Sequence, residues 1–161
     1  MAELLGISGK RIVIIGAGDA AFDYALNLCP NNQVHLLNRT EKTKCLPILK
    51  ERAFEEAQIE YQDWTTVSAI SVAQNGDLIA NCNYKGNSIQ IHADYVIGAI
   101  GRIANLDFLD ESIISRKDEL IAEGSIYFIG DVTSGLYRQT AIATGQGINV
   151  AMSINALREE F

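Results

Sequence analysis

The sequence predicts an α/β fold in which a parallel sheet carries helices on both faces and a three-stranded antiparallel meander is inserted. Short apolar, β-branched runs alternate with segments of helical periodicity, a pattern typical of right-handed βαβ units. Between residues 65 and 92 the pattern changes to alternating apolar and polar residues separated by turn sequences, which indicates antiparallel hairpins.

The first part of the chain is expected to form two strand–helix pairs followed by a strand. Arg11–Ile15 is an unbroken apolar and β-branched run, as expected for a strand buried on both faces. Asp19–Cys29 places apolar residues at helical spacing and is followed by Pro30, which cannot continue a helix. The same reasoning predicts a strand at Gln33–Leu37, a helix over about residues 45–58 and a strand at Ile59–Trp64.

The meander is expected next. Its strands are predicted at Val67–Ala73, Leu78–Tyr84 and Ser88–His92. Asn75-Gly76 separates the first two and is a strong hairpin signal, and Lys85-Gly86-Asn87 marks the second turn. Ala93–Ile100 then predicts a buried strand that returns the chain to the parallel sheet.

The last part of the chain contains one more apolar run and a long helical segment. Ile126–Ile129 predicts a buried strand, and the segment from Arg138 to Glu160 predicts a helix. We expect Ile126–Gly130 to add to the sheet beside Tyr95–Ile100, because an unpartnered strand and helix face would expose apolar surface.

The composition indicates a globular protein of 161 residues, with one domain or one domain and an appendage. Lys and Arg number 13 against 20 Asp and Glu, a net charge of −7, which argues against nucleic-acid binding because phosphate neutralisation needs clustered cations. No apolar run approaches the roughly 18 residues of a membrane-spanning helix. The N-terminus lacks the features of a signal peptide. We therefore expect neither a nucleic-acid nor a membrane partner.

Cysteine and histidine usage predicts a reduced protein without a metal centre. Cys29, Cys45 and Cys82 are an odd number and form no C-x-x-C pair, and the chain has two histidines. We therefore expect a cytoplasmic location and no metal site. No Ser/His/Asp set or pair of carboxylates stands out, so we predict no catalytic acid or base.

A glycine-rich segment joins the first strand to the first helix. Gly16-Ala17-Gly18-Asp19-Ala20-Ala21 fits the pattern G-x-G-x-x-G/A in the strand-to-helix context that this pattern requires. Gly16 permits the tight turn, Gly18 lets a pyrophosphate approach the backbone, and Ala21 keeps the helix close to the strand. The helix N-terminus adds N–H donors. A plain glycine turn is the alternative; we favour a Rossmann-like, dinucleotide-binding domain.

The end of the second strand bears on the choice between NADP(H) and NAD(H). An acidic residue there would bind the ribose hydroxyls, and a nearby arginine would favour the 2′-phosphate. Asn38 occupies the expected place of the acid and Arg39 follows it. We therefore favour NADP(H), with Arg39 binding the 2′-phosphate. The alternatives are that Arg39 is only a solvated loop residue or that Glu41 binds the ribose.

Four segments together resemble a known family. They are GAGDAAFDYALNL, LLNRTE, YVIGAIGR and IYFIGDVTSGLYRQTAIATGQG. In these segments the chain is similar to the pyridine-nucleotide-disulfide oxidoreductase flavoproteins, and most similar to thioredoxin reductases and thioredoxin-reductase-like ferredoxin/flavodoxin–NADP reductases. Of the two arginines that the family carries after the second strand, only Arg39 is present, with Thr40 at the other place.

The resemblance implies a division of the chain at residue 124. Residues 1–124 would form the NAD(P)-binding domain, with the meander at 65–92, and residues 125–161 would be a strand–helix tail similar to the C-terminal part of the family's FAD domain. Gly130 and Asp131 would then lie beside the flavin's ribityl and phosphate groups, and the run from Arg138 would open a helix aimed at the isoalloxazine. The cofactor-binding residues predicted by the motif and the resemblance are Gly16, Gly18, Asp19, Ala20, Ala21, Asn38, Arg39, Gly101, Gly130, Asp131, Arg138, Gln139 and Thr140.

Two functions follow as hypotheses. The chain would carry the NAD(P)H site of an oxidoreductase that passes a hydride from NAD(P)H to flavin, with FAD bound if the rest of the flavin domain is supplied. It would not be a thioredoxin reductase by itself, since it has no C-x-x-C. The alternative is a non-catalytic dinucleotide-binding module for redox sensing or interaction. Three origins of the chain remain open: it is an excised fragment, a short protein completed by another chain, or a free-standing domain. Its expected protein partner is a flavin-domain segment or a second copy of this chain.

Overall fold

The computed structural model describes residue 4, residues 6–135 and residues 137–159. The chain divides into two compact units, Met1–Gly101 and Arg102–Phe161. The predicted boundary at residue 124 therefore falls inside the second unit. The chain on either side of this residue packs together, since the amides of Ser125 and Ile126 both donate to the carbonyl of Leu120.

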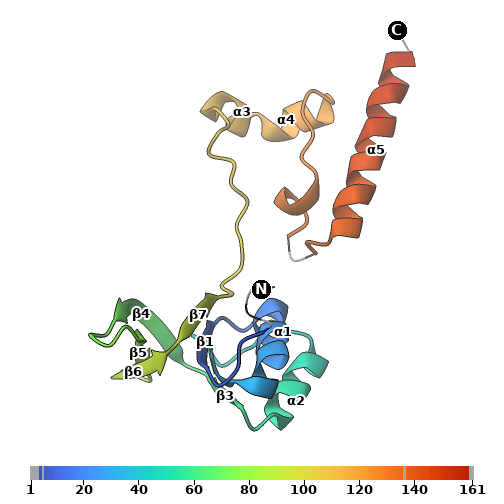
Figure 1. Cartoon of the computed structure of the whole chain (residues 1–161). Helices are drawn as coiled ribbons and strands as arrows, with labels where there is room; N and C mark the ends of the chain where they lie inside the picture. The colour runs from blue at the N-terminus through green and yellow to red at the C-terminus, as the bar shows by residue number, and fades with distance from the viewer. Residues whose placement is uncertain (1–3, 5, 136, 160–161) are drawn as a thin grey trace. The chain divides into compact units, whose positions relative to one another are not determined.

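The first unit contains a parallel sheet (Figure 1). Its described strands have the order β3-β2-β1-β7. The chain forms β1 (Arg11–Ile15), α1 (Asp19–Leu28), a 3-10 turn η2 (Cys29–Asn31), β2 (Gln33–Leu37), α2 (Pro47–Glu55), β3 (Ile59–Gln62) and, after the meander, β7 (Tyr95–Gly98). Ile14 is the register partner of both Leu36 and Ile97. The predicted α/β class is confirmed, and the expected elements of this unit form with their ends shifted by a few residues.

The meander forms as predicted between β3 and β7. Its described strands are β4 (Thr65–Val72), β5 (Leu78–Tyr84) and β6 (Asn87–Ala93), and neighbouring strands run antiparallel. The turn between β5 and β6 places Lys85 at φ +49° and Gly86 at φ +90°, which is the geometry of a tight two-residue hairpin turn.

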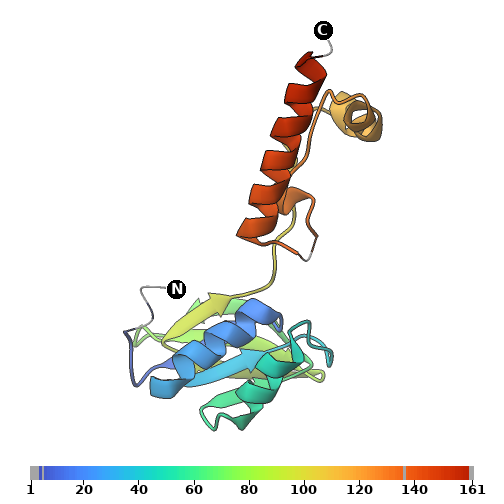
Figure 2. The same ribbon diagram turned by 90° about the vertical axis from the view of Figure 1, so that its right-hand side faces the viewer.

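The two faces of the parallel sheet are covered by different structures. Ile12 and Ile14 face a core with Phe22 and Ala25 of α1, and α1 (blue) lies beside α2 (green) over this face (Figure 2). On the other face, Val13 packs in a core with residues of the meander, namely Ala80, Cys82 and Ala93. In the described part of this unit, helices thus cover one face and the meander the other. This corrects the expectation of helices on both faces, because the chain between β3 and β7 forms strands.

Arg11, at the start of β1, ties the parallel sheet to the meander. Its guanidinium donates to Asp77 at 2.9 Å and to both carboxylate oxygens of Asp94 at 3.2 and 3.3 Å, and its backbone N–H donates to Asp94 at 2.7 Å. Asp77 immediately precedes β5, and Asp94 lies between β6 and β7. Hydrogen bonds from Arg11 lower the pKa of both carboxyl groups. One cation therefore holds together the beginnings of three strands.

The second unit is mainly helical. It contains α3 (Glu111–Ser115), α4 (Lys117–Ala122), a 3-10 turn η3 (Gly130–Val132) and α5 (Thr140–Glu159). Asp110 caps α3 by accepting from the amide of Ser112 at 2.9 Å. The expected long C-terminal helix is confirmed, with its start at Thr140. Among the described helices of the chain, none is long and apolar enough to cross a membrane.

The prediction of a strand at Ile126–Ile129 is wrong. These residues have no regular secondary structure, and 39% of the surface of Ile129 is exposed. The expected addition beside Tyr95–Ile100 is not formed either, since β7 pairs with β1 at the edge of the described sheet. An apolar, β-branched run becomes a strand only where another strand offers hydrogen-bond partners, and the described part of the second unit contains none.

Asp94→Asn is expected to destabilise the fold near neutral pH and to weaken its response to acid. The folded-state pKa of Asp94 lies below the ordinary value of about 4. Its stabilisation is therefore fully present above that value and is lost as pH falls through the folded pKa. Urea unfolding followed by circular dichroism at about pH 7 and about pH 3 checks this.

The wild-type chain should lose more stability between these two conditions than the Asp94→Asn variant does. Glu51→Gln, on the exposed side of α2, is the control and should follow the wild type. An equal loss in the wild type and in Asp94→Asn would contradict the role assigned to Arg11.

Candidate functional site

The turn after β1 requires glycine at residue 16. Gly16 has φ +135°, and a Cβ built on it would lie 2.8 Å from the carbonyl carbon of Ala99. The amide of Gly16 donates to the carbonyl of Leu37 at 2.9 Å, and the amide of Ala99 donates to the carbonyl of Ile15 at 2.8 Å. The chain therefore leaves β1 pressed between the ends of β2 and β7, at the carboxyl edge of the parallel sheet.

Gly18 serves a different purpose, because its backbone is ordinary. Its φ is −96° and its ψ is −179°, and a Cβ there would meet nothing within 4 Å. Its carbonyl accepts from the amides of Ala21 and Phe22 at 3.0 and 3.2 Å. No side chain of the described residues caps α1 at this end. The N-terminus of α1 is thus open to an anionic group, which its N–H donors and dipole favour.

The loop that precedes α2 supports this turn from one side. The amide of Lys44 donates to the carbonyl of Ala17 at 2.8 Å, and the amide of Leu46 donates to the Asp19 carboxylate at 2.7 Å. The Asp19 side chain therefore holds the protein's own loop, whereas the backbone amides of Asp19 and Ala20 belong to the first turn of α1. Ala21 is fully buried against the sheet, which fits the close packing expected there.

Asn38 and Arg39 follow β2 and are placed very differently. Asn38 is 5% exposed, and its side-chain amide donates to the hydroxyl of Tyr61 at 2.9 Å and to the carbonyl of Lys42 at 3.1 Å. Its side-chain oxygen accepts from the amide of Thr40 at 3.3 Å. Asn38 thus shapes the loop from inside, and Arg39 is exposed on its outer side.

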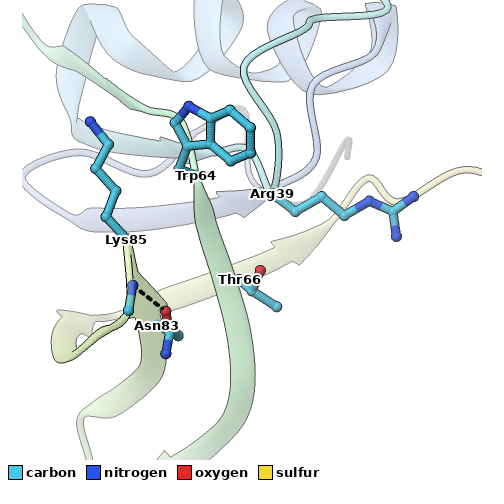
Figure 3. Close-up of a pocket in the computed structure, with 6 residues that line it drawn as sticks. Arg39, Trp64, Thr66, Asn83 and Lys85 are labelled. Carbon is cyan, nitrogen blue, oxygen red and sulfur yellow. Dashed lines mark hydrogen bonds between the residues drawn. The ribbon is translucent and has the colours of Figure 1, made fainter.

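Arg39 lines an open pocket beside the meander (Figure 3). The pocket has a volume of about 470 Å³, and the other described residues that line it are Trp64, Thr66, Asn83, Lys85 and Gly86. The Asn83 side chain accepts from the amide of Gly86 at 2.9 Å, which fixes the turn that carries Lys85. The pocket therefore combines an aromatic ring with two cationic side chains. Gly101, the remaining predicted residue of this unit, is exposed at φ +88° three residues after β7.

The second unit brings its predicted residues near the start of α5. Gly130 has φ +73° and donates to the Gln146 side chain at 2.6 Å. Asp131 lies 3.6 Å from the guanidinium of Arg102, and both side chains are more than half exposed, so this ion pair contributes little. Arg138 donates to the carbonyl of Arg102 at 2.5 Å.

The start of α5 fits an electron-rich group such as a flavin ring. The Nε atom of Arg138 is buried, and none of the described residues accepts a hydrogen bond from it. Gln139 and Thr140 are exposed, and the first turn of α5 contains no acidic residue. The partial positive charge of the helix N-terminus is thus not neutralised locally. An unpaired donor beside a helix N-terminus is compatible with such a group.

A glycine turn at the carboxyl edge of a parallel sheet, opening onto a helix N-terminus, defines a dinucleotide-binding fold. Residues 2–147 match the pyridine nucleotide-disulphide oxidoreductase family. The chain belongs to this family, as the resemblance implied.

Individual relatives agree with this assignment. The chain is 28% identical over 164 residues to a thioredoxin reductase of Bacillus subtilis, covering 94% of this chain and 52% of that protein. It is 30% identical over 149 residues to a ferredoxin–NADP reductase of Anaplasma marginale, covering 82% of this chain and 45% of that protein. The chain thus spans about half the length of these two relatives.

A solved structure supports the fold. The thioredoxin reductase of Lactococcus lactis superposes with a TM-score of 0.77 at 20% identity, covering 99% of this chain and 56% of that one. This likeness concerns the fold alone.

Sequence reasoning missed Trp64, Thr66, Asn83 and Lys85 as residues of a pocket. They come from the meander and the connection before it, and only the docking of the meander on the parallel sheet brings them to Arg39. The available signal was the Lys85-Gly86 turn, which places a cation at a hairpin tip. The sequence did not show where that tip lies.

The two glycines of the turn are expected to respond differently to alanine. Gly16→Ala should lower the free energy of unfolding by about 3 kcal/mol, since it adds an unfavourable φ and a clash with Ala99. Gly18→Ala should change it by less than about 1 kcal/mol, because the backbone is compatible and space is available. Chemical unfolding of both variants measures this difference. A large loss of stability in Gly18→Ala would contradict the open geometry of the helix start.

Proposed function

We propose that this chain carries the pyridine-nucleotide-binding part of a flavin-dependent oxidoreductase that passes a hydride from NAD(P)H to flavin. One observation carries the proposal: Gly18 leaves open space at the N-terminus of α1, at the carboxyl edge of the parallel sheet. When both cofactors are bound, the nicotinamide supplies the hydride and the flavin accepts it. The chain's own residues bind and orient them, and we assign no catalytic acid or base.

The nucleotide-binding residues have distinct roles in this proposal. Gly16 makes the turn, and Gly18 gives the pyrophosphate access to the amides of Asp19 and Ala20. Arg39, exposed beside the end of β2, binds the adenosine 2′-phosphate and favours NADP(H) over NAD(H). Asn38, whose side chain is occupied by internal hydrogen bonds, positions the loop that carries Arg39.

The second unit supplies part of the flavin site in this proposal. The amides at the start of α5, from Thr140 onward, and the Arg138 guanidinium would hold electron-rich atoms of the flavin. Gly130 and Asp131 would lie beside its ribityl and phosphate groups. This unit also leaves Ile148 and Met152 of α5 58% and 68% exposed. We propose that the remainder of a flavin-binding domain covers this apolar side, because the chain spans about half of the reductases it resembles.

Arg39→Ala is expected to weaken NADPH binding about tenfold while leaving NADH binding nearly unchanged, because only NADPH carries the 2′-phosphate that this cation holds. Isothermal titration of the full chain with each nucleotide measures both affinities. Arg52→Ala, which removes an exposed arginine of α2, should alter neither affinity. Unchanged binding of both nucleotides in Arg39→Ala would show that the loop after β2 does not contact the phosphorylated ribose.

Hydride transfer separates the oxidoreductase from a non-catalytic module. FAD and NADPH are added without oxygen to the full chain, alone and together with a flavin-binding segment supplied as a separate chain, and the visible absorbance of the flavin is followed. The proposal expects the chain to accelerate bleaching above the rate of the free cofactors, because it positions both. Acceleration that is lost in Gly18→Val supports the proposal. Nucleotide binding without any acceleration, even with the flavin-binding segment present, supports the non-catalytic dinucleotide module.

A further inference from the structure

Trp64 has an unusual backbone for a tryptophan. It lies between β3 and β4 at φ +49°, with 48% of its surface exposed. A bulky residue at positive φ is an outlier, since Asn, Asp or Gly adopts this conformation at lower cost. The exposed ring also contributes less to the core than a buried aromatic does. Neither the turn nor the core therefore accounts for an indole here, and outliers of this kind gather at ligand-binding positions.

Backbone hydrogen bonds fix Trp64 between the loop after β2 and the second hairpin turn. Its carbonyl accepts from the amide of Lys85 at 3.3 Å, and the following residue, Thr65, donates to the carbonyl of Asn38 at 2.8 Å. Three segments far apart in sequence thus meet around the indole. Figure 3 shows the side chains of Lys85 and Arg39 extending on opposite sides of the Trp64 ring.

The pocket is cationic on an otherwise acidic protein. The net charge of the chain is −7, yet the charged side chains among the described residues that line this pocket are Arg39 and Lys85. An aromatic face flanked by cations is the combination that binds a nucleobase and its phosphate, by stacking and by charge-assisted hydrogen bonds. The volume of about 470 Å³ lies within the usual range for small-molecule sites, about 300–1,000 Å³.

We propose that Trp64 and Lys85 form, with Arg39, a receptor for the phosphorylated adenosine end of the dinucleotide. The adenine stacks on the Trp64 indole. The flexible side chain of Lys85 turns away from Tyr84 and across the pocket that it lines with Arg39, so that both cations hold the 2′-phosphate. The meander thereby becomes part of the nucleotide site and determines its preference for a phosphorylated ribose. This inference rests on the proposed function for the identity of the nucleotide, whereas the receptor itself is defined by the pocket.

Trp64 is the only tryptophan of the chain, so its fluorescence reports directly on this pocket. The probe is adenosine 2′,5′-bisphosphate, with 5′-AMP as the analogue that lacks the 2′-phosphate. We expect saturable quenching by the bisphosphate and binding of 5′-AMP about tenfold weaker. Lys85→Gln should weaken bisphosphate binding about tenfold and 5′-AMP binding less than about twofold, since the 2′-phosphate is the part of the ligand that Lys85 contacts.

Lys50→Gln is the matched control. Lys50 also sits over an aromatic ring, that of Phe54, at 5.3 Å, as Lys85 sits over Tyr84 at 5.0 Å. The control therefore makes the same change in charge and removes the same kind of ring contact, and it should leave both affinities unchanged. Equal weakening in both variants would reduce the effect to general electrostatics and overturn the proposal.

Trp64→Asn tests the stacking without straining the turn, since asparagine accepts this backbone conformation. Calorimetry replaces fluorescence for this variant. We expect a folded protein, shown by an unchanged far-UV circular dichroism spectrum, that binds both adenosine probes at least about tenfold more weakly. Binding of both probes as in the wild type would overturn the stacking role.

The outcomes separate this inference from the proposed function. If NADPH binds by calorimetry and depends on Gly18, but the bisphosphate leaves Trp64 fluorescence unchanged, the proposed function stands and the receptor is overturned. If the bisphosphate binds with the expected dependence on Lys85 while NADPH does not bind, the receptor stands and the proposed function fails. If neither ligand binds, both are overturned.

Discussion

The close approach of Gly16 to Ala99 is the constraint on which the rest of the site depends. Here the backbone turns at φ +135° with no room for a side chain. One hydrogen bond ties Gly16 to the end of β2, and another ties Ile15, at the end of β1, to Ala99 just after β7. Because β1 lies at the centre of the sheet order β3-β2-β1-β7, its exit fixes where α1 begins. The open N-terminus of α1 is therefore a consequence of strand packing, and not of the loop alone.

The two ends of the strands in the parallel sheet differ in structure. At the start of β1, Arg11 joins Asp77 and Asp94 and so holds the meander on the sheet. At the other end, about 13 Å away along the strand, the turn at Gly16 and the loop of Arg39 are left accessible. The ion cluster thus stabilises the scaffold at a distance from the edge where we propose that the nucleotide binds. The meander spans both edges, since it carries Asp77 at one turn and Lys85 at the other.

Sequence patterns predicted the local structure well, because it depends on local chemistry. The strand at Arg11–Ile15, the glycine turn and the hairpin turns follow from neighbouring residues alone. The strand at Ile126–Ile129 failed because strand formation needs a partner elsewhere in the chain. The face covered by the meander and the buried position of Asn38 also depend on tertiary packing. For the same reason, the sequence could identify Arg39 as a candidate but could not place Trp64 and Lys85 beside it.

The central claim is that a dinucleotide binds at the carboxyl edge of the parallel sheet, over the start of α1. Titration of the ¹⁵N-labelled chain with NADPH, followed by amide resonances in NMR, tests this claim most directly. The largest shifts are expected at the amides of Gly18, Asp19 and Ala20, while those of Asp77 and Asp94 at the opposite edge stay in place. Saturating NADPH that leaves the amides of Gly18, Asp19 and Ala20 unchanged, or that shifts only the opposite edge, would contradict it.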